Sequence, residues 1–443
     1  MSLGKAVSDR SSSGAGNPGF PLASKSSGTH QKFSAGLGIF LLLCALAFYW
    51  GAVLRFPIEQ TKWLDLRPYP DATEYFAQAR SIERNGFPSI QIGKEKLPSR
   101  FPPGYSLLML PWLHMPNSAP VLAPFRANQA FGLLMILGTY LFYLSLARPL
   151  AAGLAALTLA TLPAFVTFSH SSLSDLTGAG MSLLAFGLVF LGLSKRQRIY
   201  IYLAAVVLGI SILVRPQLIF LTPMLIAMAL FPDGNVRIGG WLLHCFLCLL
   251  VFCAAASPFF IMNYLEFGSA FQTGYNFWVP GLKLFSLHNI PLQLGLLFGL
   301  VTATWPQYSA ANLFGTGAFI VPAYFLLALI GLWFVPRSRF FYSALLSVVV
   351  FCGVTSAYLF LDGRFYMPVF FLMLSLIVPP VETAILRLLR RNWSTGSIAI
   401  VALFLLVCIG YPSQSGFKPV GNRAQAWDAF RYWSFGTRSH VLC

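Results

Sequence analysis

Charged residues are scarce in this chain. Asp, Glu, Lys and Arg make up only 10% of its 443 residues, whereas about a quarter of a typical soluble protein is charged. Acidic residues are rarer than basic residues, with 13 Asp and Glu against 30 Lys and Arg. Together with a mean hydropathy of +0.70, this scarcity excludes an ordinary soluble protein and predicts a polytopic membrane protein.

The residue-by-residue alternation of a transmembrane β-barrel is also missing. Apolar runs of about 20 residues, the length that spans a bilayer as a helix, recur along the chain instead. We therefore expect an all-α polytopic membrane protein, because helices satisfy their own backbone groups in lipid. In a soluble protein, a net charge of +17 would suggest nucleic-acid binding. In a membrane protein, Lys and Arg are instead distributed between the two membrane sides, so we expect no nucleic-acid partner.

Cysteine and histidine patterns typical of disulfide frameworks or metal sites are lacking too. Six of the seven cysteines lie inside apolar runs, so no disulfide framework is implied. Cys245 and Cys248 have redox or zinc spacing, but they lie inside an apolar run, which favours a packing role. The histidines show no paired ligand spacing, which argues against a His-built metal site.

The apolar runs predict about eleven transmembrane helices, within a range of 10 to 13. They lie near 36–54, 124–147, 150–168, 176–194, 199–214, 217–232, 240–262, 314–335, 340–360, 366–386 and 396–412. With the N-terminus in the cytoplasm, every short inside loop carries Arg or Lys, as the positive-inside rule requires. We therefore predict a protein integral to the plasma (inner) membrane, with its long loops on the outer, periplasmic face.

Three regions follow from this topology. Residues 1–34, rich in Ser and Gly, predict a disordered cytoplasmic tail. Residues 35–412 form the transmembrane module, and residues 413–443 an outer-face tail. Two large outer loops, 55–123 and 263–313, interrupt the module. The second contains the apolar segment 291–304, whose 14 residues are too short to span and predict an interfacial or re-entrant segment.

The first outer loop gathers the charge that is rare elsewhere. The sequence PDATEYFAQARSIERNG predicts a helix from Asp71 to Gly86, with Tyr75 and Phe76 on one apolar stripe. Two interpretations of Asp71 and Glu74 remain open. Their spacing is close to a capping box, and a carboxylate fixed at a helix start can also take a proton from an incoming hydroxyl.

Basic residues follow this helix. Lys94, Lys96 and Arg100 precede PPGYSLLMLP, which predicts a return to the membrane. They either attract lipid phosphates non-specifically, at about 1 kcal/mol each, or hold a phosphate that belongs to a substrate, with Arg making a bidentate contact.

Three more ionisable residues lie at span ends on the same predicted face, namely Asp175, Arg215 and Arg364. Each has a local explanation. Asp175 is a good helix N-cap type, Arg215 can extend to the interface, and Arg364 can pair with Asp362 in an outer turn. Ionisable residues at one face of a bundle also mark substrate pathways.

Several separated motifs between about 65 and 375 carry a family resemblance. They are PDATEYFAQA, RFPPGYSLLMLP, SLSD, LVRPQL, NYLEFGSAFQTGYNFW and DGRFYMPVF. Together they resemble the GT-C superfamily of integral-membrane glycosyltransferases, in particular bacterial relatives of dolichyl-phosphate-mannose protein mannosyltransferases and of the lipid A aminoarabinose transferase.

The resemblance implies a sugar donor linked to polyprenyl phosphate and inverting transfer, on the non-cytoplasmic face, to a hydroxyl of a lipid, glycan or protein acceptor. Asp71 matches the general base. Relatives often carry a second acid beside it, where this chain has Ala72 and then Glu74 as a second catalytic carboxylate. Asp175 matches an acid that, in some relatives, helps bind a divalent cation, here together with Asp71.

The donor phosphate would be held by basic residues. The resemblance places Arg364 and Tyr366 near this phosphate, and the inventory of basic residues adds Lys94, Lys96, Arg100 and Arg215. Membrane lipids would surround this site, because the donor's lipid stays in the bilayer.

A secondary transporter of a polar or lipid-linked substrate is the alternative function. Transporters tend to show two matching halves and charges near the membrane midplane. This chain shows no clear internal repeat, and its ionisable residues collect at one predicted face. The sequence therefore favours the transferase.

Overall fold

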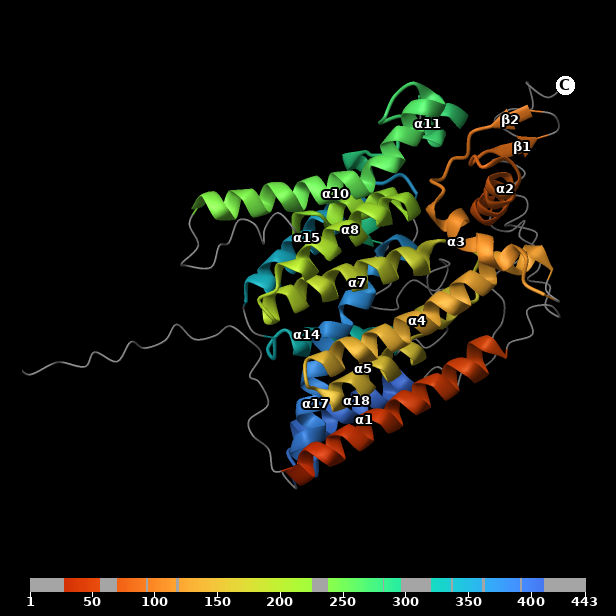
Figure 1. The fold of residues 1–443 in the computed structure, drawn as a ribbon. Helices are drawn as coiled ribbons and strands as arrows, with labels where there is room; N and C mark the ends of the chain where they lie inside the picture. The colour runs from red at the N-terminus through yellow and green to blue at the C-terminus, as the bar shows by residue number, and fades with distance from the viewer. Residues whose placement is uncertain are drawn as a thin grey trace, which may run out of the picture.

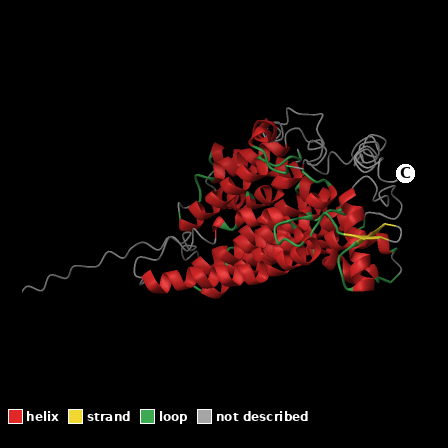
Figure 2. Ribbon diagram, turned by 90° about the horizontal axis from the view of Figure 1, so that it is seen from above, coloured by secondary structure: helices red, strands yellow, loops and turns green. Residues whose placement is uncertain are grey.

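The computed structural model describes residues 28–55, 70–92, 95–116, 119–224, 238–281, 283–295, 320–335, 338–360, 363–390 and 393–409. Helices dominate these residues (Figure 2). The long helices run side by side as a bundle, and the shorter elements of the first outer loop gather at one end (Figure 1).

The bundle is built from the long apolar runs. Its helices are α1 (Gly28–Tyr49, continued by a π-helical turn Trp50–Leu54), α4 (Ala123–Ser145), α5 (Pro149–Thr161), α6 (Pro163–Ser169), α7 (Asp175–Ser194), α8 (Arg198–Val214), α10 (Ile238–Phe267), α14 (Ile320–Gly331), α15 (Arg339–Ser356), α16 (Met367–Leu372), α17 (Leu374–Leu389) and α18 (Thr395–Ile409). Helix α1 begins at Gly28, so residues 28–34 of the predicted tail are helical.

Five helical segments of the described chain are long and apolar enough to cross a membrane. They are Lys32–Leu54, Pro120–Ser145, Asp175–Ser194, Gly240–Phe267 and Arg364–Leu389. Shorter apolar helices lie between them, including Pro149–Thr161, Arg198–Val214, Phe340–Ser356 and Thr395–Cys408. These lengths and compositions mark an integral membrane protein, while the total of eleven spans stays a prediction.

Two predicted spans differ in detail from the helices. The segment 150–168 is divided at Leu162, whose backbone is extended, because the residue before Pro163 is disfavoured in a helix. The segment 217–232 begins as the 3-10 helix η5 (Pro216–Leu221), and its residues from 225 on lie outside the described ranges.

The helices pack closely through small residues. Helices α1 and α5 meet at Gly38 and Gly153, where a Cβ added to Gly153 would lie only 2.8 Å from the Gly38 Cα. The alanines of α5 are fully buried around this crossing. Small residues at a helix crossing allow the backbones to approach, which is how membrane helices gain van der Waals contact.

The first outer loop folds at one end of the bundle (Figure 1). It consists of α2 (Pro70–Asn85), the antiparallel strands β1 (Ile90–Ile92) and β2 (Glu95–Leu97), and α3 (Gly104–Leu113). The predicted helix from Asp71 to Gly86 is confirmed, and Gly86 follows its end with φ +69°. The strand pair was not predicted and adds a small sheet to the helical fold.

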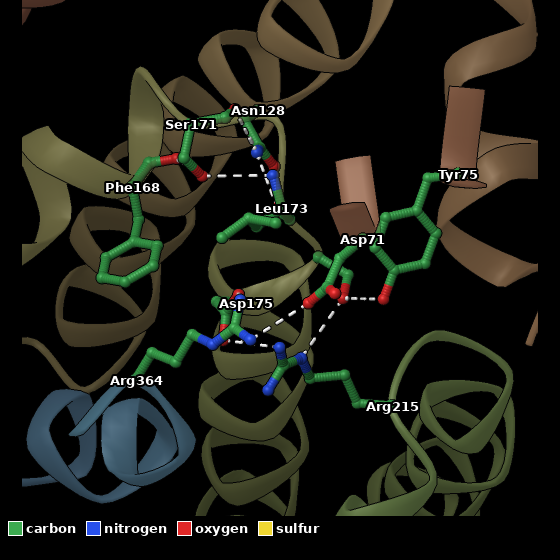
Figure 3. Close-up of polar contacts among 10 residues, drawn as sticks. Asp71, Tyr75, Asn128, Phe168, Ser171, Leu173, Asp175, Arg215 and Arg364 are labelled. Atoms are coloured by element: carbon green, nitrogen blue, oxygen red, sulfur yellow. Dashed lines mark hydrogen bonds and ion pairs between the residues drawn. The ribbon is translucent and has the colours of Figure 1, made fainter. Parts of the chain in front are cut away.

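The loops between the bundle helices bring distant segments to the same end. The start of α7, the residue after α8 and the 3-10 helix η7 (Gly363–Tyr366) lie near α2 (Figure 3). These are the turns that the topology placed on one face. The assignment of that face to the outside stays a prediction, and residues 1–27, 296–319 and 410–443 of the predicted tails and second loop lie outside the described ranges.

Candidate functional site

A cavity of about 890 Å³ lies at this end of the bundle. Its wall comes from α2, from the segment before α3, from the ends of α8 and α10, from η5 and from η7. The charged residues of the wall are Asp71, Arg100, Arg215, Glu266 and Arg364. Aromatic and aliphatic side chains supply most of the remaining wall. A cavity of this size and mixed lining is typical of ligand sites.

Four ionisable side chains form a network at the cavity (Figure 3). Arg364 Nη2 donates to Asp71 Oδ2 at 3.0 Å, and Arg364 Nη1 lies 3.9 Å from Asp175 Oδ2. Arg215 Nη2 lies 2.6 Å from Asp175 Oδ1. Asp71 and Asp175 are therefore joined through one guanidinium group, and Asp175 faces both arginines.

The network is largely removed from water. The Asp175 side chain is 0% exposed, and the side chains of Asp71 and Arg364 are 18% and 19% exposed. Charges in such surroundings attract each other more strongly than at a surface, because solvent screens them less. The structure thus brings Asp175, Arg215 and Arg364 into one shared cluster, whereas Asp362, the predicted local partner of Arg364, lies outside the described residues.

The loop before α7 fixes the position of Asp175. Asn128 of α4 donates through Nδ2 to the carbonyl oxygens of Ser171 and Leu173, each at 2.8 Å (Figure 3). Ser174 is the N-cap residue of α7 and forms no side-chain capping bond. Its hydroxyl instead accepts from Arg215 Nε at 3.2 Å and contacts the Tyr75 hydroxyl at 2.8 Å.

Glu74 pairs with Arg100 rather than with the start of its own helix. Its Oε1 contacts the Arg100 guanidinium, and its Oε2 accepts from the Arg100 backbone N–H at 3.1 Å. Burial raises the pKa of Glu74, and the positive charge of Arg100 opposes this rise. The pair attaches the segment before α3 to α2. The catalytic role of Glu74 and the phosphate-binding role of Arg100 stay predictions.

The other predicted phosphate ligands lie away from the cavity wall or outside the described ranges. Lys94 belongs to the residues that the structure does not describe. Lys96 is exposed on β2. Tyr366 is buried, with its hydroxyl 3.1 Å from Ser356 Oγ. Of the described candidates, Arg100, Arg215 and Arg364 line the cavity.

Sequence reasoning did not single out Tyr275, an aromatic residue of the motif NYLEFGSAFQTGYNFW that lines the cavity. The short helix α11 (Gly274–Trp278) begins with a capping box at Thr273, and Trp278 Nε1 donates to the Pro98 carbonyl oxygen at 2.8 Å. The Tyr275 ring meets Phe101 edge-on at 5.6 Å, and burial raises the pKa of Tyr275 well above its ordinary value. Tyr275 is therefore a neutral hydroxyl group on the cavity wall.

Asp71 and Asp175 do not provide a good metal site. No cluster of three or more His, Cys, Asp or Glu side chains suited to a metal occurs among the described residues. Guanidinium groups lie against both carboxylates, so a divalent cation would have to displace Arg215 or Arg364. The donor set fits a network of ion pairs rather than a cation.

Comparison with solved structures finds the same fold in known proteins. ArnT from Cupriavidus metallidurans, solved bound to undecaprenyl phosphate, is similar with a TM-score of 0.54 and 15% identity, over 91% of this chain and 76% of ArnT. The Archaeoglobus fulgidus oligosaccharyltransferase in its apo form matches with a TM-score of 0.54 and 18% identity, over 90% of this chain and 56% of that chain.

A second structure of the archaeal enzyme, AglB with an inhibitory peptide and a dolichol-phosphate, matches with a TM-score of 0.51 and 15% identity, over 88% of this chain and 56% of that chain. This chain therefore spans little more than half of the oligosaccharyltransferase. No family model and no curated protein sequence matches the chain. The chain therefore shares its fold with ArnT and with AglB.

Proposed function

We propose that the protein transfers a sugar, with inversion, from a polyprenyl-phosphate donor to an acceptor hydroxyl in this cavity. The observation that carries the proposal is the joining of Asp71, Arg364, Asp175 and Arg215 into one network. The network brings a carboxylate and two guanidinium groups to a cavity whose remaining wall is mainly apolar. A transfer from a lipid phosphate needs each of these parts.

The two arginines hold the donor phosphate. Guanidinium groups match phosphate oxygens in a bidentate geometry, and those of Arg215 and Arg364 both line the cavity. The phosphate competes with Asp71 and Asp175 for these groups. Its arrival draws Arg364 away from Asp71 and leaves that carboxylate able to accept a proton.

The lipid chain of the donor occupies the apolar part of the cavity. This wall includes Phe259 and Phe260 of α10, Phe220 of η5, and Phe285. Two similar structures support a lipid donor, because they contain undecaprenyl phosphate and dolichol-phosphate. The cavity sits at the end of membrane-crossing helices, so a polyprenyl chain can remain in the bilayer while its head group reacts.

The reaction follows from these positions. The acceptor oxygen attacks the anomeric carbon as its proton passes to Asp71. The bond from that carbon to the phosphate oxygen breaks, and the electron pair stays on the lipid phosphate. The transition state resembles an oxocarbenium ion, and the positive charges of Arg215 and Arg364 stabilise the leaving phosphate. Attack from the side opposite to the phosphate inverts the anomeric centre.

The finer assignments belong to the same proposal. The sugar is a hexose or pentose, and the acceptor is a lipid, a glycan or a protein. The positive-inside pattern of the short loops supports a cytoplasmic N-terminus and a site on the outer, periplasmic face of the plasma membrane.

Lipid-linked sugars provide the direct test. We would extract polyprenyl-phosphate sugars from membranes of cells with and without the protein and compare the amounts by mass spectrometry. A donor that accumulates without the protein, and is consumed again when the protein is restored but not when Asp71→Asn is supplied, supports the proposal. If no lipid-linked sugar changes in amount and the purified protein binds no undecaprenyl phosphate, the proposal is wrong.

A further inference from the structure

One aromatic ring lies against both arginines of the Asp71–Arg364–Asp175–Arg215 network. The guanidinium carbon Cζ of Arg215 lies 5.6 Å from the centroid of the Phe365 ring, and that of Arg364 lies 5.3 Å from the same centroid. The two arginines come from separate segments, since Arg215 follows α8 and Arg364 belongs to η7. They therefore share a neutral ring as well as the carboxylate of Asp175.

The Phe365 ring is held in place by its surroundings. It is only 6% exposed and lines the cavity. The ring of Tyr358 meets it edge-on, at an interplanar angle of 85° and a centroid distance of 5.2 Å, which is a favoured arrangement of two aromatic rings. Burial strengthens the attraction between a cation and a ring face, because water then competes less for the cation. Phe365 thus gives both guanidinium groups a favourable contact.

A ring face and a carboxylate hold a guanidinium group in different ways. The Asp71 carboxylate accepts an N–H hydrogen bond from Arg364, so it occupies a donor that a phosphate would need. A ring attracts the positive charge through its π electrons and occupies no such donor. When the donor phosphate takes the place of Asp71, the contact with Phe365 remains. The ring therefore matters most in the donor complex, where Asp71 no longer holds Arg364.

We propose that Phe365 is a positioning residue, which keeps the guanidinium groups of Arg215 and Arg364 at the cavity wall while their N–H groups bind the donor phosphate. The inference rests on the proposed function and adds a residue to its phosphate site. Phe365→Leu keeps an apolar side chain but removes the ring face. It should weaken binding of the donor phosphate by about tenfold, as loss of a buried cation–π contact does.

Fluorinated phenylalanines separate this attraction from packing. Each fluorine draws electrons away from the ring face and changes the size of the ring little, so the attraction for a cation weakens in steps. The full-length protein, carrying phenylalanine with one, two or three ring fluorines at position 365, is purified into neutral phosphatidylcholine nanodiscs and titrated with undecaprenyl phosphate. The affinity should fall with each added fluorine, by about tenfold over the series.

Phe371 provides the matched control. It lies on α16, is 0% exposed and does not line the cavity. Its ring meets that of Phe165 at a centroid distance of 6.0 Å, and none of the cation–π contacts among the described residues includes it. The same fluorine series at position 371 should leave the affinity for undecaprenyl phosphate unchanged.

Two results would overturn the positioning role while the wild type still binds undecaprenyl phosphate. One is an affinity that stays constant through the series at position 365. The other is an equal loss in both series, which would report altered packing rather than attraction between the ring and the arginines. If the wild type itself binds no undecaprenyl phosphate, the proposed function is wrong, and the role of Phe365 in donor binding falls with it.

Discussion

Asp71 and Arg364 are separated by 293 residues in the chain, yet Arg364 Nη2 donates to Asp71 Oδ2 at 3.0 Å. Asp71 lies in the first turn of α2, and Arg364 lies in η7, just before α16. The contact joins the first outer loop to a turn near the end of the bundle. The sequence identified both residues as candidates, but only the tertiary structure shows that Arg364 contacts the candidate base.

The proposed base can be tested by a change that keeps its shape. Asp71→Asn should insert and fold normally but reduce sugar transfer by about 10²- to 10⁴-fold, because an amide cannot accept the acceptor's proton. Transfer from a polyprenyl-phosphate donor would be measured in purified membranes. Glu83→Gln, on the same helix but paired with Arg80, serves as the control. Full transfer by Asp71→Asn would contradict the base assignment.

The two arginines of the network should act on donor binding. Arg364→Ala and Arg215→Ala each remove a charged hydrogen-bond donor and should weaken donor use by about 1.5–3 kcal/mol, measured as kcat/KM. Arg364→Lys should recover only part, because Lys offers a point charge without the planar fork. Arg390→Ala, an exposed residue at the end of α17, should leave the kinetics unchanged. Equal kinetics in all four variants would rule out phosphate binding by this pair.

The Glu74–Arg100 pair should matter for stability more than for donor binding. Arg100→Ala leaves a buried carboxylate without its partner, and breaking such a pair costs about 3–5 kcal/mol. We expect earlier thermal unfolding and faster proteolysis near residues 95–104. The double variant Glu74→Gln/Arg100→Gln should recover part of the loss, because no charge remains unpaired. A raised KM for the donor with undiminished stability would instead favour the phosphate-binding role of Arg100.

Close packing beside α11 provides a steric prediction. A Cβ added to Gly274 would overlap the Ser99 carbonyl oxygen and lie 2.6 Å from the Arg100 Cα. Gly274→Ala should therefore displace α11 and lower transfer. Gly138→Ala is the matched control, since no atom lies within 4 Å of its added Cβ, and it should be neutral or improve helix stability by up to about 1 kcal/mol. Equal effects of the two variants on transfer would contradict this packing argument.

Local sequence patterns were sufficient to predict part of the candidate site. The polar segment after Pro70, with Tyr75 and Phe76 on one face, predicted α2 to within a residue at each end. Charges at the ends of apolar runs identified Asp175, Arg215 and Arg364 as candidates. These predictions rest on helix periodicity and on the cost of charge in lipid, which are properties of short segments.

Other features depend on contacts between distant segments. The β1–β2 pair is only three residues long on each strand, too short for a pattern to indicate. Glu74 and Arg100 are 26 residues apart and are matched only when the hairpin folds back on α2. Glu266 was part of a recognised motif, but its place on the cavity wall depends on how α10 packs.

By itself, the sequence determined that this protein is a helical membrane protein whose charge collects at one end of its bundle, because hydropathy and charge placement restrict which segments can enter lipid. Only the tertiary structure decided which charges meet. Asp71, Asp175, Arg215 and Arg364 come from four separate segments, and the packing of the helices sets their distances. Which ionisable residues pair thus depends on contacts between distant segments. In this fold Arg100 pairs with Glu74, and Arg215 and Arg364 lie beside the carboxylates of the candidate site.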